Sequence, residues 1–496
     1  MSTRLSRRNF IRTSAAASVG LLSVPYLNCG KVGVSNPLKN DFARLNFGVT
    51  SMGLGGQASV QWTPPDLDAA GIIAKAYNSG INYFDTSNSY GLSAVNYGRA
   101  FRQLNLVPGL PGYDESRRRS IWLTTKTGIP WGKSNQVMSG SNGPAGSTAV
   151  DLMKRTLILV FGDGEEYYPP DAYIDMVLAH SVENIEEVDA LYTGLSNPDP
   201  KAEQIGAFAA LLDYRDGTNL TGLNPKEERL IRHIGFSCHD AGICMELIQR
   251  DEKNIIDGML IPINANDFNY FNLQNNAIPV AAAKNMGVIG MKVFARANFY
   301  VENATASRSP DTMYRAIGSD AMPSRPLVEY TVSTPGIQTT VIGIGGIDDD
   351  PKQCQLTQNL SAAQIASGSL SQTDRRSIEQ MAGRIKDGMT NTYQSTSRWM
   401  SGPRDYAATQ ELRGSQRVVQ LTWHSAYAGI DPLAEYEIWR GTENIGKVPH
   451  KPQTTKAPFV FEDAVADRVY HRYRIIAVDT VGQKLPSNDI AVPAMV

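Results

Sequence analysis

The sequence predicts a (β/α)8 barrel followed by a small all-β sandwich. Three observations support this fold class. Eight short apolar runs alternate with helix-like segments between Asn46 and Leu360, most runs are apolar throughout, and after Gln416 apolar and polar residues alternate. Parallel strands covered by helices are apolar on both faces, whereas half-buried antiparallel strands alternate. The 496 residues, 42% apolar and 19% charged, allow about two to four domains with a large core.

The eight candidate barrel strands are separated by amphipathic segments. In residues 66–80, apolar side chains including Ile72 and Ala76 recur at helical spacing, and Gly80 follows as a typical helix stop. Eight such alternations predict a closed barrel with its active site at the C-terminal strand ends. A doubly wound sheet is the competing fold, but "GLGGQAS" does not fit the GxGxxG that such a fold favours early in the chain. The candidate strands are residues 46–56, 81–87, 121–126, 174–180, 231–237, 258–264, 287–294 and 339–344.

Three segments interrupt the alternation. Residues 105–119 and 132–146 are rich in Gly, Pro, Ser and charge. The second follows a strand end, which predicts a loop over the barrel mouth, and the first precedes a strand, which places it at the opposite face. Residues 184–228 look like an enlarged helix-and-loop insertion, and long insertions of this kind are often functional.

The C-terminal residues 413–496 are predicted to form a separate β-sandwich after a barrel domain of residues 40–400. Regular short strands between turns indicate this architecture. The spacing of Trp423, Tyr436 and Tyr473 resembles a fibronectin type III module. A generic β-sandwich in which these aromatic residues only pack is the alternative, and neither interpretation predicts catalysis there. A glycan or a protein is the partner that we consider for this domain.

Residues 1–30 are predicted to be an export signal. "SRRNFIR" precedes a short apolar stretch that is too short to span a bilayer, so no integral membrane domain is expected. The paired arginines resemble the twin-arginine export motif, which implies periplasmic localisation. Cys29 is a candidate lipid-attachment site, although "YLN" before it fits the lipobox poorly, and cleavage nearby and an uncleaved anchor are the alternatives.

Composition excludes several classes of partner and site. The chain has 47 Lys and Arg against 49 Asp and Glu, so there is no electrostatic reason to expect nucleic acid as a partner. Its four cysteines include no CxxC pair, so we expect neither a structural metal site nor a dense disulfide framework.

Chemistry-bearing residues occur at three successive predicted strand ends. Asp85 ends the second run, Lys126 the third and His180 the fourth, and Tyr90 follows Asp85 by five residues. An ammonium near a phenol stabilises the phenolate, and a carboxylate keeps that ammonium charged. This arrangement predicts a proton donor, Tyr90, for carbonyl reduction, with His180 orienting the substrate oxygen. Carbonyl reduction also needs a hydride. No side chain can supply one, so it has to come from a reduced nicotinamide.

The motifs around these residues resemble the aldo-keto reductase family over most of residues 46–360. "FDTSNSYG", "TTKTG", "IDMVLAHS", "IGFSCHD" and "TPGIQTTVIGIGG" carry the resemblance. It implies an NAD(P)-dependent oxidoreductase in which Tyr90 is the general acid, Lys126 and Asp85 tune it, and His180 orients the carbonyl.

The nicotinamide-holding positions depart from the family pattern. Ser237 is kept, but Cys238 stands where the family has Asn, and an alanine beside Asn264 stands where it has Gln. Met291 occupies the place of a stacking tyrosine, and Lys292 is expected to face the pyrophosphate. The resemblance therefore points to an outlying subgroup, with these residues as its cofactor-binding set.

The adenine end is implied to lie after the last strand. Gly343, Gly345, Gln355 and Asn359 match the family there, and three aspartates are inserted before Lys352. Acids repel a 2′-phosphate, which favours NAD, whereas Lys352 leaves NADP open.

The leading interpretation is an exported NAD(P)-dependent oxidoreductase acting on a small carbonyl or sugar-like substrate. The alternatives are a non-catalytic nucleotide- or ligand-binding protein that keeps the barrel, and a surface-interaction protein whose sandwich does the binding.

Overall fold

The computed structural model describes residues 37–135, 146–266, 272–297, 299–300, 309, 313–385 and 399–495. The predicted export signal, including Cys29, lies outside the described residues, as does most of the predicted loop at 132–146.

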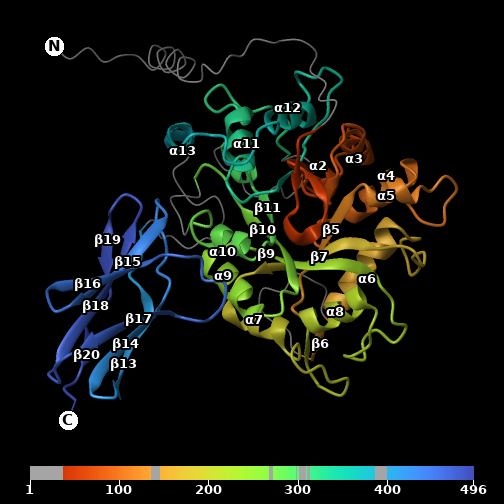
Figure 1. Ribbon diagram of the computed structural model, residues 1–496. Coiled ribbons are helices and arrows are strands. Elements are labelled where there is room, and N and C mark those ends of the chain that lie inside the picture. The colour runs from red at the N-terminus through yellow and green to blue at the C-terminus, as the bar shows by residue number, and fades with distance from the viewer. Residues whose placement is uncertain are drawn as a thin grey trace, which may run out of the picture.

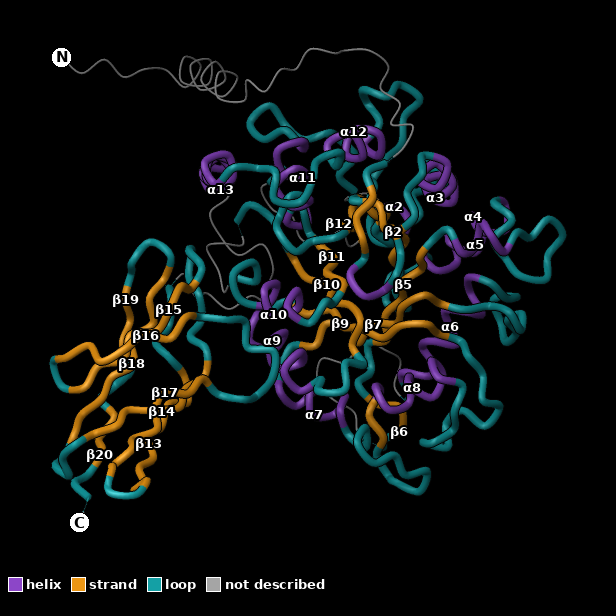
Figure 2. The backbone as a smooth tube through the Cα atoms, in the orientation of Figure 1, coloured by secondary structure: helices purple, strands orange, loops and turns teal. Residues whose placement is uncertain are grey.

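Eight parallel strands close into a barrel, which confirms the predicted fold class. The strands surround the centre of the larger body in Figure 2. Each predicted strand has an observed counterpart, and the seam closes through pairing of β12 with β3. In order around the barrel they are β3 (Met52–Leu54), β4 (Tyr83–Asp85), β5 (Trp122–Thr127), β7 (Ile174–Val182), β9 (Ile231–Cys238), β10 (Ile256–Pro262), β11 (Gly287–Met291) and β12 (Thr339–Ile342).

Helices follow the strands and cover the outside of the barrel (Figure 1). Over the described residues, none combines the length and apolar composition that crossing a bilayer requires. They are α2 (Ser59–Trp62), α3 (Ala69–Asn78), α4 (Ser93–Gln103), α5 (Glu115–Arg119), α6 (Ala149–Val160), α7 (Ile185–Tyr192), α8 (Ala207–Asp216), α9 (Ala241–Arg250), α10 (Ala277–Ala283), α11 (Ser324–Val332), α12 (Gln355–Ala362) and α13 (Gln372–Ile385).

Helix α3 forms where its sequence predicts it. The Asp68 carboxylate accepts a hydrogen bond from the Ala70 N–H and caps the first turn. Ile72 and Ile73 are buried against the strands. Gly80 takes a left-handed φ of 86° just after the helix, a conformation that glycine adopts at low cost.

The first predicted strand, residues 46–56, is two strands that turn at Ser51. Its first half is β2 (Gly48–Thr50), which forms a hairpin with β1 (Lys39–Asp41) outside the barrel, and its second half is β3. Between β1 and β2, Phe42 enters the barrel interior and packs edge-on against Tyr83 and Trp122. The hairpin therefore closes the end of the barrel opposite the active site, which fixes the strand ends at the other face.

The predicted insertion at 184–228 contains α7 and α8. A two-stranded ribbon, β6 (Trp131–Lys133) with β8 (Ile205–Gly206), ties it to the segment after β5.

The C-terminal domain consists of two antiparallel sheets packed around Trp423, Tyr436 and Tyr473. Its first strand begins at Arg404, upstream of the predicted boundary. One sheet contains β13 (Arg404–Arg413), β14 (Gln416–His424) and β17 (Phe459–Val465). The other contains β15 (Leu433–Arg440), β16 (Glu443–Pro449), β18 (His471–Asp479), β19 (Lys484–Pro486) and β20 (Ile490–Val492).

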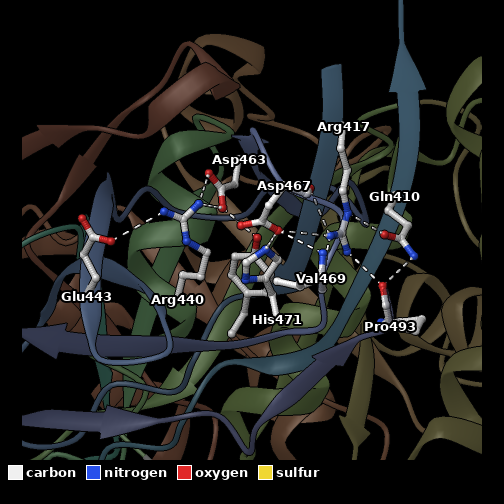
Figure 3. Close-up of polar contacts among 10 residues, drawn as sticks. Gln410, Arg417, Arg440, Glu443, Asp463, Asp467, Val469, His471 and Pro493 are labelled. Atoms are coloured by element: carbon white, nitrogen blue, oxygen red, sulfur yellow. Dashed lines mark hydrogen bonds and ion pairs between the residues drawn. The ribbon is translucent and has the colours of Figure 1, made fainter. Parts of the chain in front are cut away.

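A buried arginine closes the sandwich at the start of β14 (Figure 3). Arg417 is 1% exposed and donates to the Gln410 side chain and to the carbonyls of Val469 and Pro493. These bonds hold the β17–β18 loop and the C-terminal segment together. The role of Arg417 is structural, because a buried guanidinium has to find several acceptors.

The sandwich docks on the barrel through the β14–β15 loop at the other end of β14, beside α9 and α10 (Figure 1). Asn276 Nδ2 donates to the Ala428 carbonyl at 3.1 Å, and the Ala428 N–H donates back to Asn276 Oδ1 at 2.9 Å. Asn272 and Asn275 each donate to the Gly429 carbonyl at 3.2 Å. Further pairs across the interface are Gln249–Gln453, Glu246–Lys456 and Arg376–Asp431.

Candidate active site

The four predicted catalytic residues lie together at the C-terminal end of the barrel. Asp85 ends β4, Lys126 lies on β5, His180 lies on β7, and Tyr90 lies in the loop after β4. Lys126 Nζ donates to Asp85 Oδ1 at 2.5 Å and to the Thr86 carbonyl at 2.9 Å. Because β4, β5 and β7 are adjacent and parallel, their ends bring these side chains to one rim.

The Lys126–Asp85 pair is almost completely removed from water. The side chains are 1% and 5% exposed. Burial lowers the pKa of Lys126 and raises the pKa of Asp85, and the attraction between the two opposes both shifts. The ion pair therefore keeps a cation in a place where an isolated ammonium would be costly.

Tyr90 lies over this cation. Lys126 Nζ is 4.7 Å from the centroid of the half-buried Tyr90 ring. The Tyr90 ring also meets the His180 ring edge-on, with centroids 5.7 Å apart. The phenol is thus flanked by the ammonium on one side and the imidazole on another.

His180 is held neutral. Burial lowers its pKa well below the usual value, and the positive charges of Lys126 and Lys292 lower it further. Its Nδ1 lies 3.4 Å from the hydroxyl oxygens of both Ser87 and Ser89. Either atom of these pairs can donate. In the tautomer in which Nδ1 accepts from a serine hydroxyl, the neutral imidazole carries its proton on Nε2, which makes Nε2 a hydrogen-bond donor.

A cavity of about 190 Å³ opens beside this cluster. Asp85 and Tyr90 line one end of it, and Leu260, Met291 and Val341 give it an apolar floor. Other residues that line it include Gly55, Gly56, Gln57, Gln61, Lys292, Phe294, Tyr300, Tyr314, Ser324, Gly343, Gln355 and Asn359.

Five of the predicted cofactor-binding residues line this cavity, namely Met291, Lys292, Gly343, Gln355 and Asn359. The other three do not. A Cβ on Gly345 would lie 2.1 Å from the Tyr314 carbonyl, so this glycine permits close packing of the segment before α11. Ser237 and Asn264 are buried and bonded to neighbouring backbone.

Ser237 and Asn264 each hold a residue with left-handed backbone on an adjacent strand end. Ser181, with φ of 52°, donates its N–H to Ser237 Oγ at 2.9 Å. Lys292, with φ of 60°, accepts from Asn264 Nδ2 at 3.3 Å through its carbonyl. Left-handed backbone costs a non-glycine residue about 1 kcal/mol or more. The two side chains thus stabilise the backbone directly after His180 and directly after Met291.

Gln355 joins two segments of the cavity wall. Its Oε1 accepts from the N–H groups of Gly345 and Gly346, and its Nε2 donates to the carbonyls of Tyr314 and Ala316. These four bonds use both ends of the amide, so Gln355 shapes the wall from within the protein.

Several residues of the site escape prediction from the sequence. Tyr300 and Tyr314 stack with centroids 4.5 Å apart and an interplanar angle of 9° on the cavity wall. They come from the segment between β11 and α11, which carries no periodic pattern. Ser87 and Ser89 lie inside the motif that identifies Asp85 and Tyr90, so the motif itself is the signal that would have found them.

Comparisons with solved structures return aldo-keto reductases. Two are solved structures described as a putative aldo-keto reductase from Pseudomonas aeruginosa. They are 19% and 17% identical, cover 67% and 68% of this chain and 97% and 98% of their own, and have TM-scores of 0.41 and 0.40. A third is an aldo/keto reductase from Klebsiella pneumoniae in complex with NADP and acetate, 15% identical, covering 72% of this chain and 97% of its own, with a TM-score of 0.41.

The sequence profile of the aldo/keto reductase family matches residues 45–333, which is more than half of the chain and spans β3 to α11. The match includes all four residues of the buried cluster at the barrel rim. The chain belongs to the aldo/keto reductase family.

Proposed function

We propose that this NAD(P)-dependent oxidoreductase interconverts a carbonyl and an alcohol, with Tyr90 as the general acid. The observation that carries the proposal is the position of Lys126 Nζ, 2.5 Å from Asp85 Oδ1 and 4.7 Å from the Tyr90 ring centroid. A buried ammonium at this position stabilises the phenolate that remains once Tyr90 has given up its proton.

Proton transfer follows from this geometry. Reduction adds a hydride to the carbonyl carbon, and Tyr90 gives its hydroxyl proton to the carbonyl oxygen. His180 remains neutral and does not compete as the acid, and in its Nε2-protonated tautomer it donates a hydrogen bond to that oxygen. In the oxidative direction, the Tyr90 phenolate takes the alcohol proton back.

The cavity residues fit a nicotinamide nucleotide. The apolar floor of the cavity, formed by Leu260, Met291 and Val341, suits a flat ring. A thioether such as that of Met291 packs well on aromatic faces. Gly343 lets backbone line the wall without a side chain. NADPH or NADH, when bound, supplies the hydride. We propose that Met291, Gly343 and Asn359 hold it, while Ser237, Asn264 and Gln355 keep the wall in shape.

Polar groups near Tyr90 favour a hydrophilic, sugar-like substrate. Ser87 and Ser89 carry hydroxyls beside His180, and Gln57 and Gln61 line the cavity. Such groups form hydrogen bonds with the hydroxyls of a polyol. An apolar aldehyde would leave the same groups without hydrogen-bond partners. Turnover of a panel of hydroxylated and apolar carbonyl compounds tests this preference. Higher kcat/KM for the apolar members would contradict it.

The decisive experiment for the reaction is Tyr90→Phe. This substitution removes the transferable proton and retains the ring, so we expect loss of turnover by about 100-fold or more with nearly unchanged NADPH and NADH binding. Tyr167→Phe is the matched control, because Tyr167 is 58% exposed on the segment before β7. Equal turnover of Tyr90→Phe and wild type refutes the role of Tyr90. Nucleotide binding without turnover in the wild type supports the non-catalytic alternative.

We further propose export by the twin-arginine route. The support is the Arg7–Arg8 pair before a short apolar stretch. Replacing both arginines by lysines should leave the protein in the cytoplasm, and mass spectrometry of the exported protein reports cleavage, or lipid on Cys29. An unchanged distribution of the variant between compartments would exclude this route.

The sandwich is proposed to be a fibronectin type III-like module with a glycan or protein partner. The order β13-β14-β17 in one sheet and β16-β15-β18-β19 in the other supports this interpretation. Glycan-array binding by the full-length protein, compared with Tyr470→Ser at a 52% exposed position, tests it.

A further inference from the structure

Lys292 lines the same cavity as Asp85 and Tyr90. Among the described residues that line this cavity, Asp85 and Lys292 are the charged ones. The side chain is half-buried and comes from the first residue after β11, across the barrel from β4 and β5. A second lysine is therefore present at the catalytic centre, and the reaction as described above does not use it.

The backbone of Lys292 is held in a conformation that a lysine rarely adopts. Its φ is 60°, and its carbonyl accepts from Asn264 Nδ2 at 3.3 Å and from the Ala295 N–H at 2.8 Å. Just before it, the Met291 carbonyl accepts from the Ile263 N–H at 2.9 Å. Backbone strain of about 1 kcal/mol that several bonds maintain is typical of functional sites.

The charges at the rim change when Tyr90 loses its proton. With Asp85 ionised and Lys126 protonated, the buried pair is neutral, and a phenolate on Tyr90 would bring the cluster to a net charge of −1. The charge of Lys292 stabilises this phenolate, in addition to the positive charge that a nicotinamide ring gains when it gives up its hydride. Low dielectric surroundings make this stabilisation stronger than it would be in water.

We infer that Lys292 is a positioning residue of the proton-donating centre, where its ammonium keeps Asp85 ionised and favours the Tyr90 phenolate, and that it is not primarily a phosphate ligand. The inference deepens the proposed function and rests on it. The charge of Lys292 opposes the rise that burial causes in the pKa of Asp85, and it adds to the fall that burial causes in the pKa of His180.

The titratable groups of the cluster come from several elements, and the buried phenols of Tyr83 on β4 and Tyr97 on α4 also face Asp85. Asp85 and Tyr90 belong to β4 and its loop, Lys126 to β5, His180 to β7, and Lys292 to the end of β11. Loss of the Lys292 charge should therefore raise the pKa of His180 and of the Tyr90 phenol together. Because the charge of Lys292 acts on both His180 and Asp85, we expect a shift of about one pKa unit.

The first test needs no substrate. The chain has six histidines, so the His180 imidazole can be followed by NMR across a pH titration of the full-length protein. We expect Lys292→Met to raise the midpoint for His180 and Lys292→Arg to restore it. Lys75→Met is the control, because Lys75 Nζ bonds the Asp348 carbonyl at the surface. An unchanged midpoint in Lys292→Met overturns the inference, and Lys292→Gln repeats the test if the methionine variant misfolds.

The second test is the pH profile of kcat/KM with an accepted carbonyl substrate. Tyr90 acts while it holds its proton, so activity falls as pH rises through its pKa. In Lys292→Met the basic limb should move upward by about one pH unit, with nucleotide Kd changed less than about threefold. If the basic limb of the pH profile does not move in Lys292→Met and the variant binds the nucleotide tenfold more weakly, Lys292 is a phosphate ligand and the inference is overturned. Absence of turnover in the wild type refutes the proposed reaction instead, and the His180 titration then decides the role of Lys292.

Discussion

Asn276 should be the side chain on which docking of the sandwich depends most. It is 5% exposed and sits at the start of α10 on the barrel. Its amide pairs with both backbone groups of Ala428 and also donates to the Asn272 carbonyl at 2.7 Å. The side-chain amide thus pairs with the N–H and the carbonyl of one residue of the β14–β15 loop, as the backbone of a neighbouring β-strand would.

The magnitude follows from the groups that lose partners. Asn276→Ala removes three hydrogen bonds and leaves the buried N–H and carbonyl of Ala428 without their present partners. Leaving a buried polar group unsatisfied costs about 1–3 kcal/mol, so the two groups together predict a loss of about 2–6 kcal/mol. Because about 1.4 kcal/mol is a factor of ten, the Ala428 amide should exchange about one to four orders of magnitude faster.

Hydrogen exchange of the peptide that spans residues 425–431 measures this change directly, and urea unfolding of the full chain reports its global effect. Asn275→Ala is the control. Asn275 donates to the Gly429 and Ile430 carbonyls from a half-buried position, where water can replace it, so we expect a loss below about 1 kcal/mol. Equal exchange rates in the two variants, or exchange in Asn276→Ala within threefold of wild type, would refute the reasoning.

Two further predictions concern buried ionisable groups. Burial lowers the pKa of His450 to about 4, so between pH 6.5 and 4 the unfolded chain takes up a proton that the folded chain does not, and stability should fall by about 1.4 kcal/mol per pH unit as pH falls. Unfolding free energies at pH 7.5 and 4.5 should therefore differ more in the wild type than in His450→Gln, and equal differences would contradict the assignment. Lys126→Met should cost about 3–5 kcal/mol because it leaves Asp85 buried without its cation. Adding Asp85→Asn should restore much of the stability and none of the activity, and a double variant as unstable as the single one would count against this account.

The barrel strands and the residues at the barrel rim could be predicted from the sequence, because both depend on local patterns. Runs such as residues 176–179 are apolar on both faces, as expected for a strand covered by helices. A residue at the end of such a run lies at the rim whatever its neighbours are. Asp85, Lys126 and His180 were therefore placed correctly by strand position alone.

The roles of the residues behind the rim depend on register and could not be predicted in this way. Ser237 and Asn264 lie at strand ends, as expected, but the partner of each is backbone on the adjacent strand. Sequence position gives the height of a side chain in the barrel, whereas the neighbouring strand decides which group it meets. The role of Gln355 could not be predicted from its position either, because the carbonyls that accept from its Nε2 belong to the segment before α11.

The hydrogen bonds of Ser237 with Ser181 and of Asn264 with Lys292 act as clamps on the strand ends that carry two predicted site residues. Ser181 and Lys292 follow His180 and Met291 directly, and both have left-handed backbone. Releasing either clamp would let the strand end relax by rotation of a single residue, which moves the preceding side chain. We therefore expect Ser237 to affect turnover through His180, and Asn264 to affect the affinity for the nucleotide through Met291 of the apolar floor.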